Sequence, residues 1–61
     1  MEEVLEVAKR ELLKIPGVVG VSARGYALVV YVETPEDAAR VPREFMGRPV
    51  RVEVVGRVRL L

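Results

Sequence analysis

The absence of both cysteine and histidine constrains this 61-residue chain more than any other feature of its sequence. A domain this small buries only about 60% of its unfolded surface, and it usually needs disulfides, a metal ion or self-association to stay folded. Without cysteine there is no disulfide and no thiolate metal site, and without histidine the commonest metal ligand is missing. We therefore expect one domain over residues 1–61 that holds no metal or cofactor and relies on dense packing or on a second chain.

The remaining composition bears on the growth temperature of the source organism and on the cellular location of the protein. Asparagine and glutamine are absent together with cysteine, while charged residues make up 31% of the chain. These three residue types are heat-labile, so their joint absence favours a hyperthermophilic, archaeal source. The N-terminus is acidic, unlike a signal peptide, and no apolar run approaches the about 20 residues that a bilayer requires. We expect a cytoplasmic protein without a membrane partner.

The hydrophobic pattern predicts a helix over residues 2–15, ended by Pro16-Gly17, and then two strands over 18–23 and 26–33. A tight turn at Arg24-Gly25 is the simplest connection between these strands. With that turn, Val19, Val21, Ala23, Tyr26, Leu28, Val30 and Val32 face the helices, and Val18, Gly20, Ser22, Ala27, Val29, Tyr31 and Glu33 face outwards. The apolar face of the helix is formed by Val4, Leu5, Ala8, Leu12 and Ile15.

A short second helix is predicted to follow the strands. Thr34 can cap it, Pro35 suits its first position, and Asp37 completes a variant of the capping box. Pro42 limits this helix, although a second turn can run over residues 43–46.

Residues 48–61 alternate between apolar and polar side chains and predict one long final strand. A helix joins this strand to the one before it, so a right-handed crossover would make the two parallel. The expected fold is an α+β two-layer sandwich of order α-β-β-α-β, with two helices on one face of a three-stranded sheet. It corresponds to a ferredoxin-like domain without its first strand. Either the second and third strands pair directly, or another chain fills the gap between them.

No group of residues predicts catalysis. Ser22 lies in a strand, and the chain has no histidine to activate it. The acidic pairs at 2–3 and 36–37 each stand at a helix start, where the helix dipole stabilises acids. The glycine-containing run 16–20 connects a helix to a strand, whereas phosphate-binding loops connect a strand to a helix. We therefore expect no enzyme activity.

Charge is divided unevenly along the chain. Residues 1–39 carry a formal charge of −3, from four basic and seven acidic residues, and residues 40–61 carry +4, from six arginines and two acids. Such a division can align two chains head to tail. With the small core and the long strand edge, it makes a self-associating module, a homodimer or higher homo-oligomer, the leading hypothesis. The interface would use the outer sheet face or the edge of the final strand, with Val18, Val29, Tyr31, Val55, Val58 and Leu60.

The arginines support an alternative partner, nucleic acid. Arg51, Arg57 and Arg59 alternate on the outer side of the final strand, and Tyr31 lies on the same side of the strand before it. Arginines beside an exposed aromatic ring can hold phosphates and stack on a base. The residues of this alternative are Arg48, Arg51, Arg57, Arg59 and Tyr31. A solvated or ion-paired thermophile surface explains the same arginines, and a small-ligand site at a dimer seam is a third alternative.

Four segments share one pattern of hydrophobic and glycine residues. They are Ile-Pro-Gly-Val-Val-Gly-Val (15–21), Leu-Val-Val-Tyr-Val (28–32), Val-Pro-Arg-Glu-Phe-Met-Gly-Arg-Pro-Val (41–50) and Val-Glu-Val-Val-Gly (52–56). This pattern resembles a small domain of uncharacterised prokaryotic proteins that often precedes or accompanies a trypsin-like protease domain. The resemblance implies an accessory module without catalytic residues of its own.

Overall fold

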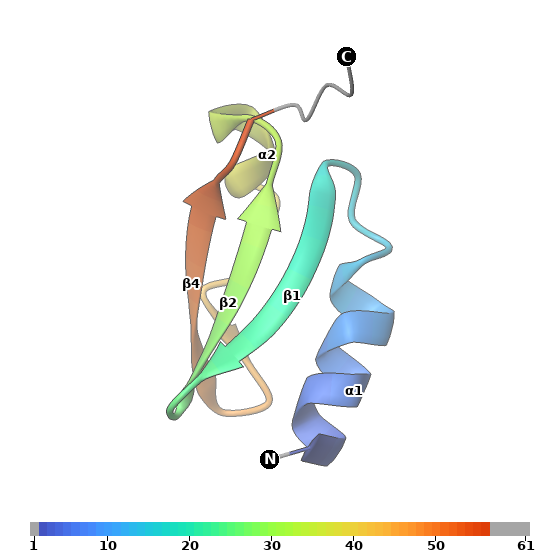
Figure 1. The fold of residues 1–61 in the computed structure, drawn as a ribbon, viewed down its shortest axis with the longest axis vertical. Coiled ribbons are helices and arrows are strands. Elements are labelled where there is room, and N and C mark those ends of the chain that lie inside the picture. The colour runs from blue at the N-terminus through green and yellow to red at the C-terminus, as the bar shows by residue number, and fades with distance from the viewer. Residues whose placement is uncertain (1, 57–61) are drawn as a thin grey trace.

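The computed structural model of the chain describes residues 2–56. Its elements are α1 (Glu2–Leu12), β1 (Val18–Arg24), β2 (Ala27–Val32), α2 (Pro35–Ala38), β3 (Glu44–Phe45) and β4 (Arg48–Val54). The strands form one mixed sheet in the order β1-β2-β4-β3 (Figure 1). β2 is antiparallel to β1 and parallel to β4, and β3 is antiparallel to β4. The α+β class is confirmed, but the sheet has four strands where three were predicted.

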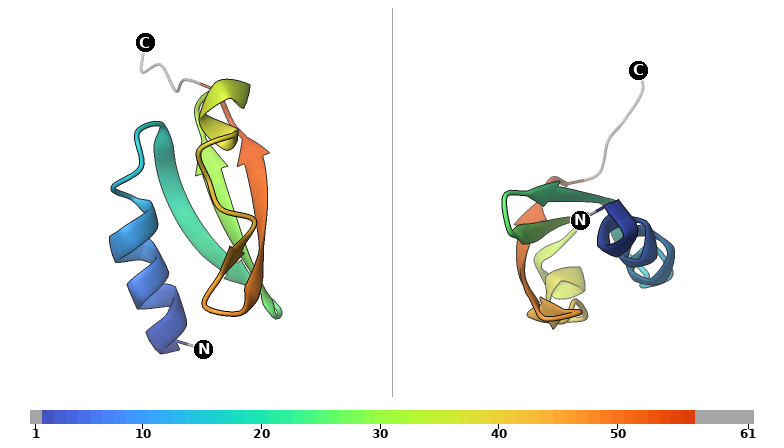
Figure 2. Two further views of the ribbon diagram at one scale, coloured as in Figure 1. Left: turned by 180° about the vertical axis from the view of Figure 1, so that it is seen from behind. Right: turned by 90° about the horizontal axis from the view of Figure 1, so that it is seen from below.

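The hydrophobic core lies between the concave face of the curved sheet and the two helices (Figure 2). Alternate residues of β2 point into it, and Leu28, Val30 and Val32 are fully buried. Ala8 and Leu12 of α1 pack on them from one side, and Val41 from the segment after α2. Partly buried side chains around this core are Val4, Leu5, Ile15, Val18, Ala23, Ala38, Phe45, Val50 and Val52. Within residues 2–56, both helices thus cover one sheet face and leave the other uncovered.

α1 ends at Leu12, earlier than the predicted end at residue 15. Beyond it the backbone tightens, since the Lys14 N–H donates to the Glu11 carbonyl and the Ile15 N–H to the Leu12 carbonyl. These bonds span three residues, as in a 3₁₀ turn, and shift the chain out of α geometry before Pro16. The predicted apolar face is confirmed, because all five of its side chains pack in or against the core.

The β1–β2 hairpin turns at Gly25-Tyr26, one position later than predicted, and Arg24 pairs with Ala27. Gly25 has a φ of +60°, while Tyr26 has a negative φ. A two-residue loop with a positive φ only at its first position is a type II′ turn, for which glycine is the preferred first residue. The shift removes Tyr26 from the sheet and leaves it exposed in the turn.

A β-bulge at the start of β1 changes which valine faces the core. The register shifts between Val18, which pairs with Val32, and Gly20, which pairs with Tyr31. The extra residue, Val19, is exposed, and Val18 packs against the core. The prediction that Val19 points inwards and Val18 outwards is therefore wrong, because strict alternation does not continue through a bulge.

α2 has the predicted cap. The Thr34 hydroxyl accepts a hydrogen bond from the Asp37 backbone N–H at 3.2 Å and donates one to the Asp37 carboxylate at 2.9 Å. Pro35 occupies the start of the helix. The Asp37 carboxylate also occupies the space that a side chain at position 17 would need, so it packs directly on Gly17. The cap therefore joins α2 to the loop between α1 and β1.

The segment before β4 forms a strand, not the helical turn predicted over residues 43–46. β3 pairs with the start of β4, and Met46-Gly47 connects them. Met46 and Gly47 both have positive φ, at 52° and 78°. Two positive φ values define a type I′ hairpin turn, which asparagine and glycine favour. Methionine in this position gives little indication of such a turn, so the sequence pattern did not predict β3.

β4 pairs directly with β2, and the chain passes between them through α2 in a right-handed crossover (Figures 1 and 2). The predicted parallel orientation is confirmed, and of the two alternatives for the gap, direct pairing is correct. The Val55 N–H still donates to the Val32 carbonyl at 2.9 Å, one residue beyond the end of β4. The rest of the predicted strand, over 57–61, lies outside the described residues.

Candidate interaction surface

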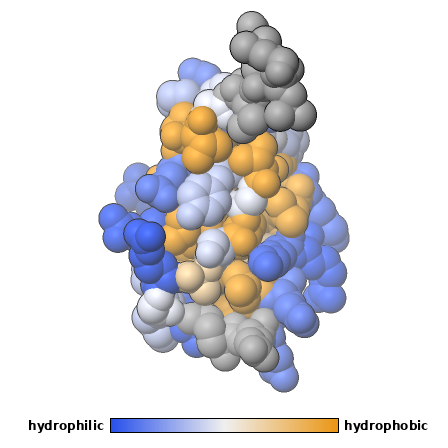
Figure 3. Space-filling view, viewed as in Figure 1, coloured by the Kyte–Doolittle hydropathy of each residue, from blue (hydrophilic) through white to orange (hydrophobic). Residues whose placement is uncertain are grey.

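Self-association and nucleic-acid binding, the two hypotheses from the sequence, both involve the convex side of the sheet. Figure 3 shows this side facing the viewer. Residues that alternate with the buried positions of β2 and β4 point to this side. We call it the outer face. It consists of Gly20, Ser22 and Arg24 on β1, Ala27, Val29 and Tyr31 on β2, and Arg51 and Glu53 on β4.

Strand pairing arranges these side chains in two central rows across the sheet. The Val29 row has a basic residue on β4, and the Tyr31 row has an acidic one. The Val29 row is Ser22, Val29 and Arg51, and the Tyr31 row is Gly20, Tyr31 and Glu53. On the outer face, β4 therefore carries a positive charge in the Val29 row and a negative charge in the adjacent Tyr31 row.

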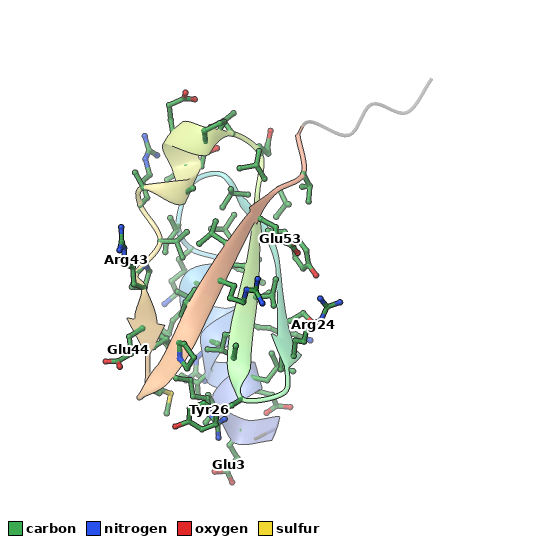
Figure 4. The ribbon with its side chains drawn as sticks, turned by 90° about the vertical axis from the view of Figure 1, so that its left-hand side faces the viewer. Glu3, Arg24, Tyr26, Arg43, Glu44 and Glu53 are labelled. Carbon is green, nitrogen blue, oxygen red and sulfur yellow. The ribbon has the colours of Figure 1, made fainter. Side chains whose placement is uncertain are left out.

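A shallow hollow opens over Val29, lined by Arg24, Val29, Arg51 and Glu53. Val29 is only 5% exposed although it does not belong to the core cluster. The aliphatic stems of long charged side chains cover apolar surface in this way while their charged ends stay in water. Figure 4 shows Arg24 and Glu53 projecting in one direction and Arg43 and Glu44, at the β3 end of the curved sheet, projecting in the opposite direction.

Tyr31 stands beside this hollow and rests on β1. A Cβ added to its cross-strand partner Gly20 would lie 3.4 Å from Cδ2 of the Tyr31 ring. Glycine at this position leaves the backbone of β1 open for the ring. The half-buried ring packs over Gly20 in the row next to the hollow, so the outer face has an aromatic residue adjacent to a depression.

The charged groups of the outer face have no ionic partner within the described chain. Over residues 3–56 the salt bridges are Arg10–Glu11 at 3.4 Å and Lys14–Glu11 at 3.6 Å, both on or just after α1. Neither Arg51 nor Glu53 forms one, so both are available to a partner.

The structure separates the arginines of the nucleic-acid hypothesis. Arg51 lies on the outer face. Arg48 does not, because its guanidinium Cζ lies 4.5 Å from the centroid of the Tyr26 ring and its Nη1 donates to the Tyr26 carbonyl at 3.3 Å. Arg57 and Arg59 lie outside the described residues. Arg24, which is not among the residues of that hypothesis, is brought to the hollow by the β1–β2 register.

The predicted self-association residues are also divided. Val29 and Tyr31 lie on the outer face, whereas Val18 packs against the core. Val55 is 47% exposed just after β4. Val58 and Leu60 lie outside the described residues.

Two further valines near Val55 are half-exposed, Val19 at 51% and Val54 at 49%. Val54 pairs with Val32, and Val32 also pairs with the start of β1, so these valines lie at one end of the sheet. Figure 3 shows apolar side chains gathered at this end. Sequence alternation placed Val19 in the core and missed its exposure, because the bulge at the start of β1 leaves Val19 unpaired.

The part of the chain that the structure describes has neither a cluster of metal ligands nor a membrane-spanning helix. No group of three or more acidic side chains lies close enough together there to hold a metal ion. No helix there is long and apolar enough to cross a membrane.

No model of a known protein family matches the chain, and no curated protein and no solved structure matches it either. The side chains and charges of the outer face are therefore the features that bear on function.

Proposed function

We propose that the protein is a non-catalytic interaction module that self-associates, with the outer face as its interface and a second copy of the same chain as its partner. The observation that carries this proposal is the uncovered face, with Val29 and Tyr31 at its centre. The described core contains only seven buried side chains. Because a core of this size gives marginal stability, packing a second chain on the uncovered face would stabilise the fold.

The charges of the outer face favour a second copy over nucleic acid. Glu53 lines the same hollow as Arg24 and Arg51 and would repel a phosphate placed there. Arg48 is occupied by Tyr26, and Tyr31 is the one aromatic residue of the outer face. Sheets that bind RNA usually offer two or three aromatic residues. A protein surface that carries both signs of charge is the better complement.

The size of the face sets the expected affinity. Three strands about 4.8 Å apart, with about six residues at ~3.3 Å each, cover roughly 14 by 20 Å. This area is below the about 800 Å² per partner of a standard stable interface. We therefore expect a weak dimer, with a dissociation constant in the micromolar range.

Analytical ultracentrifugation over a dilution series tests the proposal. The average mass should rise from the 6.8 kDa of one chain towards twice that value as the concentration increases. Tyr31→Lys should abolish the rise, because it places a charge at the centre of the interface. Leu13→Lys is the matched control, since it adds the same charge at an exposed apolar residue that lies away from the outer face. A chain that remains monomeric at several hundred micromolar, about a hundredfold above the expected dissociation constant, would overturn the proposal.

The same samples distinguish the nucleic-acid alternative. Phosphate contacts release counterions, so binding of that kind would weaken steeply with salt. Retardation of RNA or DNA at low salt by a chain that stays monomeric would support nucleic-acid binding in place of self-association.

Two further expectations accord with this proposal. The resemblance to a small domain of prokaryotic proteins implies an accessory module. We also regard the fold as a shortened ferredoxin-like arrangement, in which β2 and β4 pair where that fold has another strand between them.

A further inference from the structure

We infer that two copies pack their outer faces together about a two-fold axis that runs across the strands, between the Val29 row and the Tyr31 row. Arg51 of each copy then faces the partner's Glu53. This inference rests on the proposed self-association and adds the symmetry of the dimer and the contacts that select it.

Symmetry leaves two simple arrangements. For two sheets to face each other, the two-fold axis must lie in the plane between them. If the axis runs along β2, each row faces the same row of the partner and β4 faces β1, so Arg51 lies opposite Ser22 and Glu53 opposite Gly20. If the axis runs across the strands, β4 faces β4 and the Val29 row faces the Tyr31 row. Only the second arrangement pairs the charges.

The spacing of Arg51 and Glu53 along β4 fits this second arrangement. Arg51 and Glu53 are two residues apart on one strand, about 6.6 Å, and they point to the same side. An axis midway between them brings each guanidinium opposite a carboxylate, and symmetry makes this contact twice. Neither group has a salt bridge within residues 3–56. Complementary charges of this kind determine the register of an interface more than its affinity.

The shapes of the two rows lead to the same axis independently of charge. The hollow lies over Val29, and the half-buried Tyr31 ring, which packs over Gly20, lies in the adjacent row. Rotation about the axis between the rows places the Tyr31 ring of each copy over the partner's Val29. The ring then lies between the guanidinium groups of Arg24 and Arg51, where a cation–π interaction is favourable. The same rotation places Val55, exposed just after β4, opposite the exposed Pro49 of β4.

Charge reversal tests the axis. Arg51→Glu and Glu53→Arg should each weaken the dimer about tenfold or more, because each places two pairs of like charges in contact. The double variant Arg51→Glu/Glu53→Arg should recover wild-type association, since the pair is reversed in both copies. An equimolar mixture of the two single variants should also recover it, because a copy with two acids then meets a copy with two arginines.

Arg43→Glu and Glu44→Arg are the matched controls. They change net charge by the same amounts at exposed residues at the β3 end of the curved sheet, which project away from Arg24 and Glu53 in Figure 4. Both should leave the dissociation constant unchanged, and circular dichroism establishes that every variant is folded.

The outcomes separate this inference from the proposed function. A wild-type chain that does not associate overturns the proposed function. If the wild-type chain associates and Tyr31→Lys prevents it, but the single reversals have no effect, the outer face is the interface and the axis is wrong. Single reversals that weaken association without recovery in the double variant and in the mixture also overturn the axis.

Discussion

The guanidinium of Arg48 lies over the ring of Tyr26, with its Cζ 4.5 Å from the ring centroid. The Arg48 Nη1 donates to the Tyr26 carbonyl at 3.3 Å, and the Tyr26 hydroxyl donates to the Gly47 carbonyl at 3.2 Å. Tyr26 belongs to the β1–β2 turn, Gly47 belongs to the turn between β3 and β4, and Arg48 is the first residue of β4. These contacts therefore join the two hairpins at one end of the sheet.

Arg48→Ala should lower the free energy of unfolding by about 1 kcal/mol, because it removes a cation–π contact and a hydrogen bond at an exposed site. Arg48→Lys should lose less, since it keeps the charge but not the planar guanidinium. A double-mutant cycle with Tyr26→Leu should give a coupling of about 0.5–1 kcal/mol by urea unfolding. Strictly additive effects would show that the two hairpins are not coupled here. All measurements belong at concentrations where the chain is monomeric, because association adds apparent stability.

Gly17→Ala should be the most destabilising of the single substitutions proposed for stability. Gly17 has a φ of +91°, and an added Cβ would collide with the Asp37 carboxylate. Gly47→Ala is the control, because Gly47 has a φ of +78° with no atom within 4 Å of an added Cβ. We expect a loss of about 1–2 kcal/mol for Gly47→Ala from the backbone alone, and about 3 kcal/mol or more for Gly17→Ala. Equal losses in chemical denaturation would mean that Asp37 moves away without cost.

Met46→Asn should stabilise the fold by about 0.5–1 kcal/mol, because asparagine tolerates the left-handed conformation of Met46 better than methionine does. Met46 has a φ of 52° and is 58% exposed, so little packing is lost. For a domain of this size the gain corresponds to an increase of about 2–8 °C in the unfolding temperature. Met46→Ala is the control and should give no comparable gain, since alanine keeps the Cβ penalty. An equal gain from alanine would attribute the effect to the removal of an exposed apolar side chain.

Thr34→Ala should cost about 1 kcal/mol, as is typical for loss of a helix N-cap. The hydroxyl both accepts from the Asp37 backbone N–H and donates to the Asp37 carboxylate, so alanine removes two hydrogen bonds. Thr34→Ser keeps the hydroxyl and should retain most of the stability in thermal unfolding. A serine variant as unstable as the alanine variant would indicate that the threonine methyl group, and not the cap, is responsible.

Local signals predicted the starts of both helices and the apolar face of α1. The cap of α2 depends on residues 34–37, and its hydrogen bonds form between neighbours in the chain. The apolar face of α1 follows from helical spacing and appears in the core without exception. Such features depend on short-range geometry, which a sequence expresses directly.

The strand connections were predicted less well, for a physical reason. Both hairpin turns need positive φ values, at Gly25 in one and at Met46-Gly47 in the other. Glycine indicated the first turn only to within one residue, and methionine gave no indication of the second. The bulge at Val19 likewise has no local marker, because it arises from pairing with β2.

The candidate surface was predicted in part. Alternation placed Val29, Tyr31 and Arg51 on the outer face, and the structure confirms it. The hollow that joins Arg24 to Glu53 depends on the register of three strands, which no single segment contains. Position along β4 separated Arg48 from Arg51, because residues three apart on a strand point to opposite sides.

The sequence by itself determined the class of fold, the core-facing side of each long element, the α2 cap and the lack of cysteine and histidine chemistry. All of these depend on composition or on spacing within one segment. Only the tertiary structure decided that β2 and β4 pair directly, that a fourth strand, β3, extends the sheet beside β4, and that Arg51 and Glu53 flank Val29 and Tyr31 in adjacent rows. These features arise from contacts between segments far apart in the chain, where packing and strand register outweigh local preference.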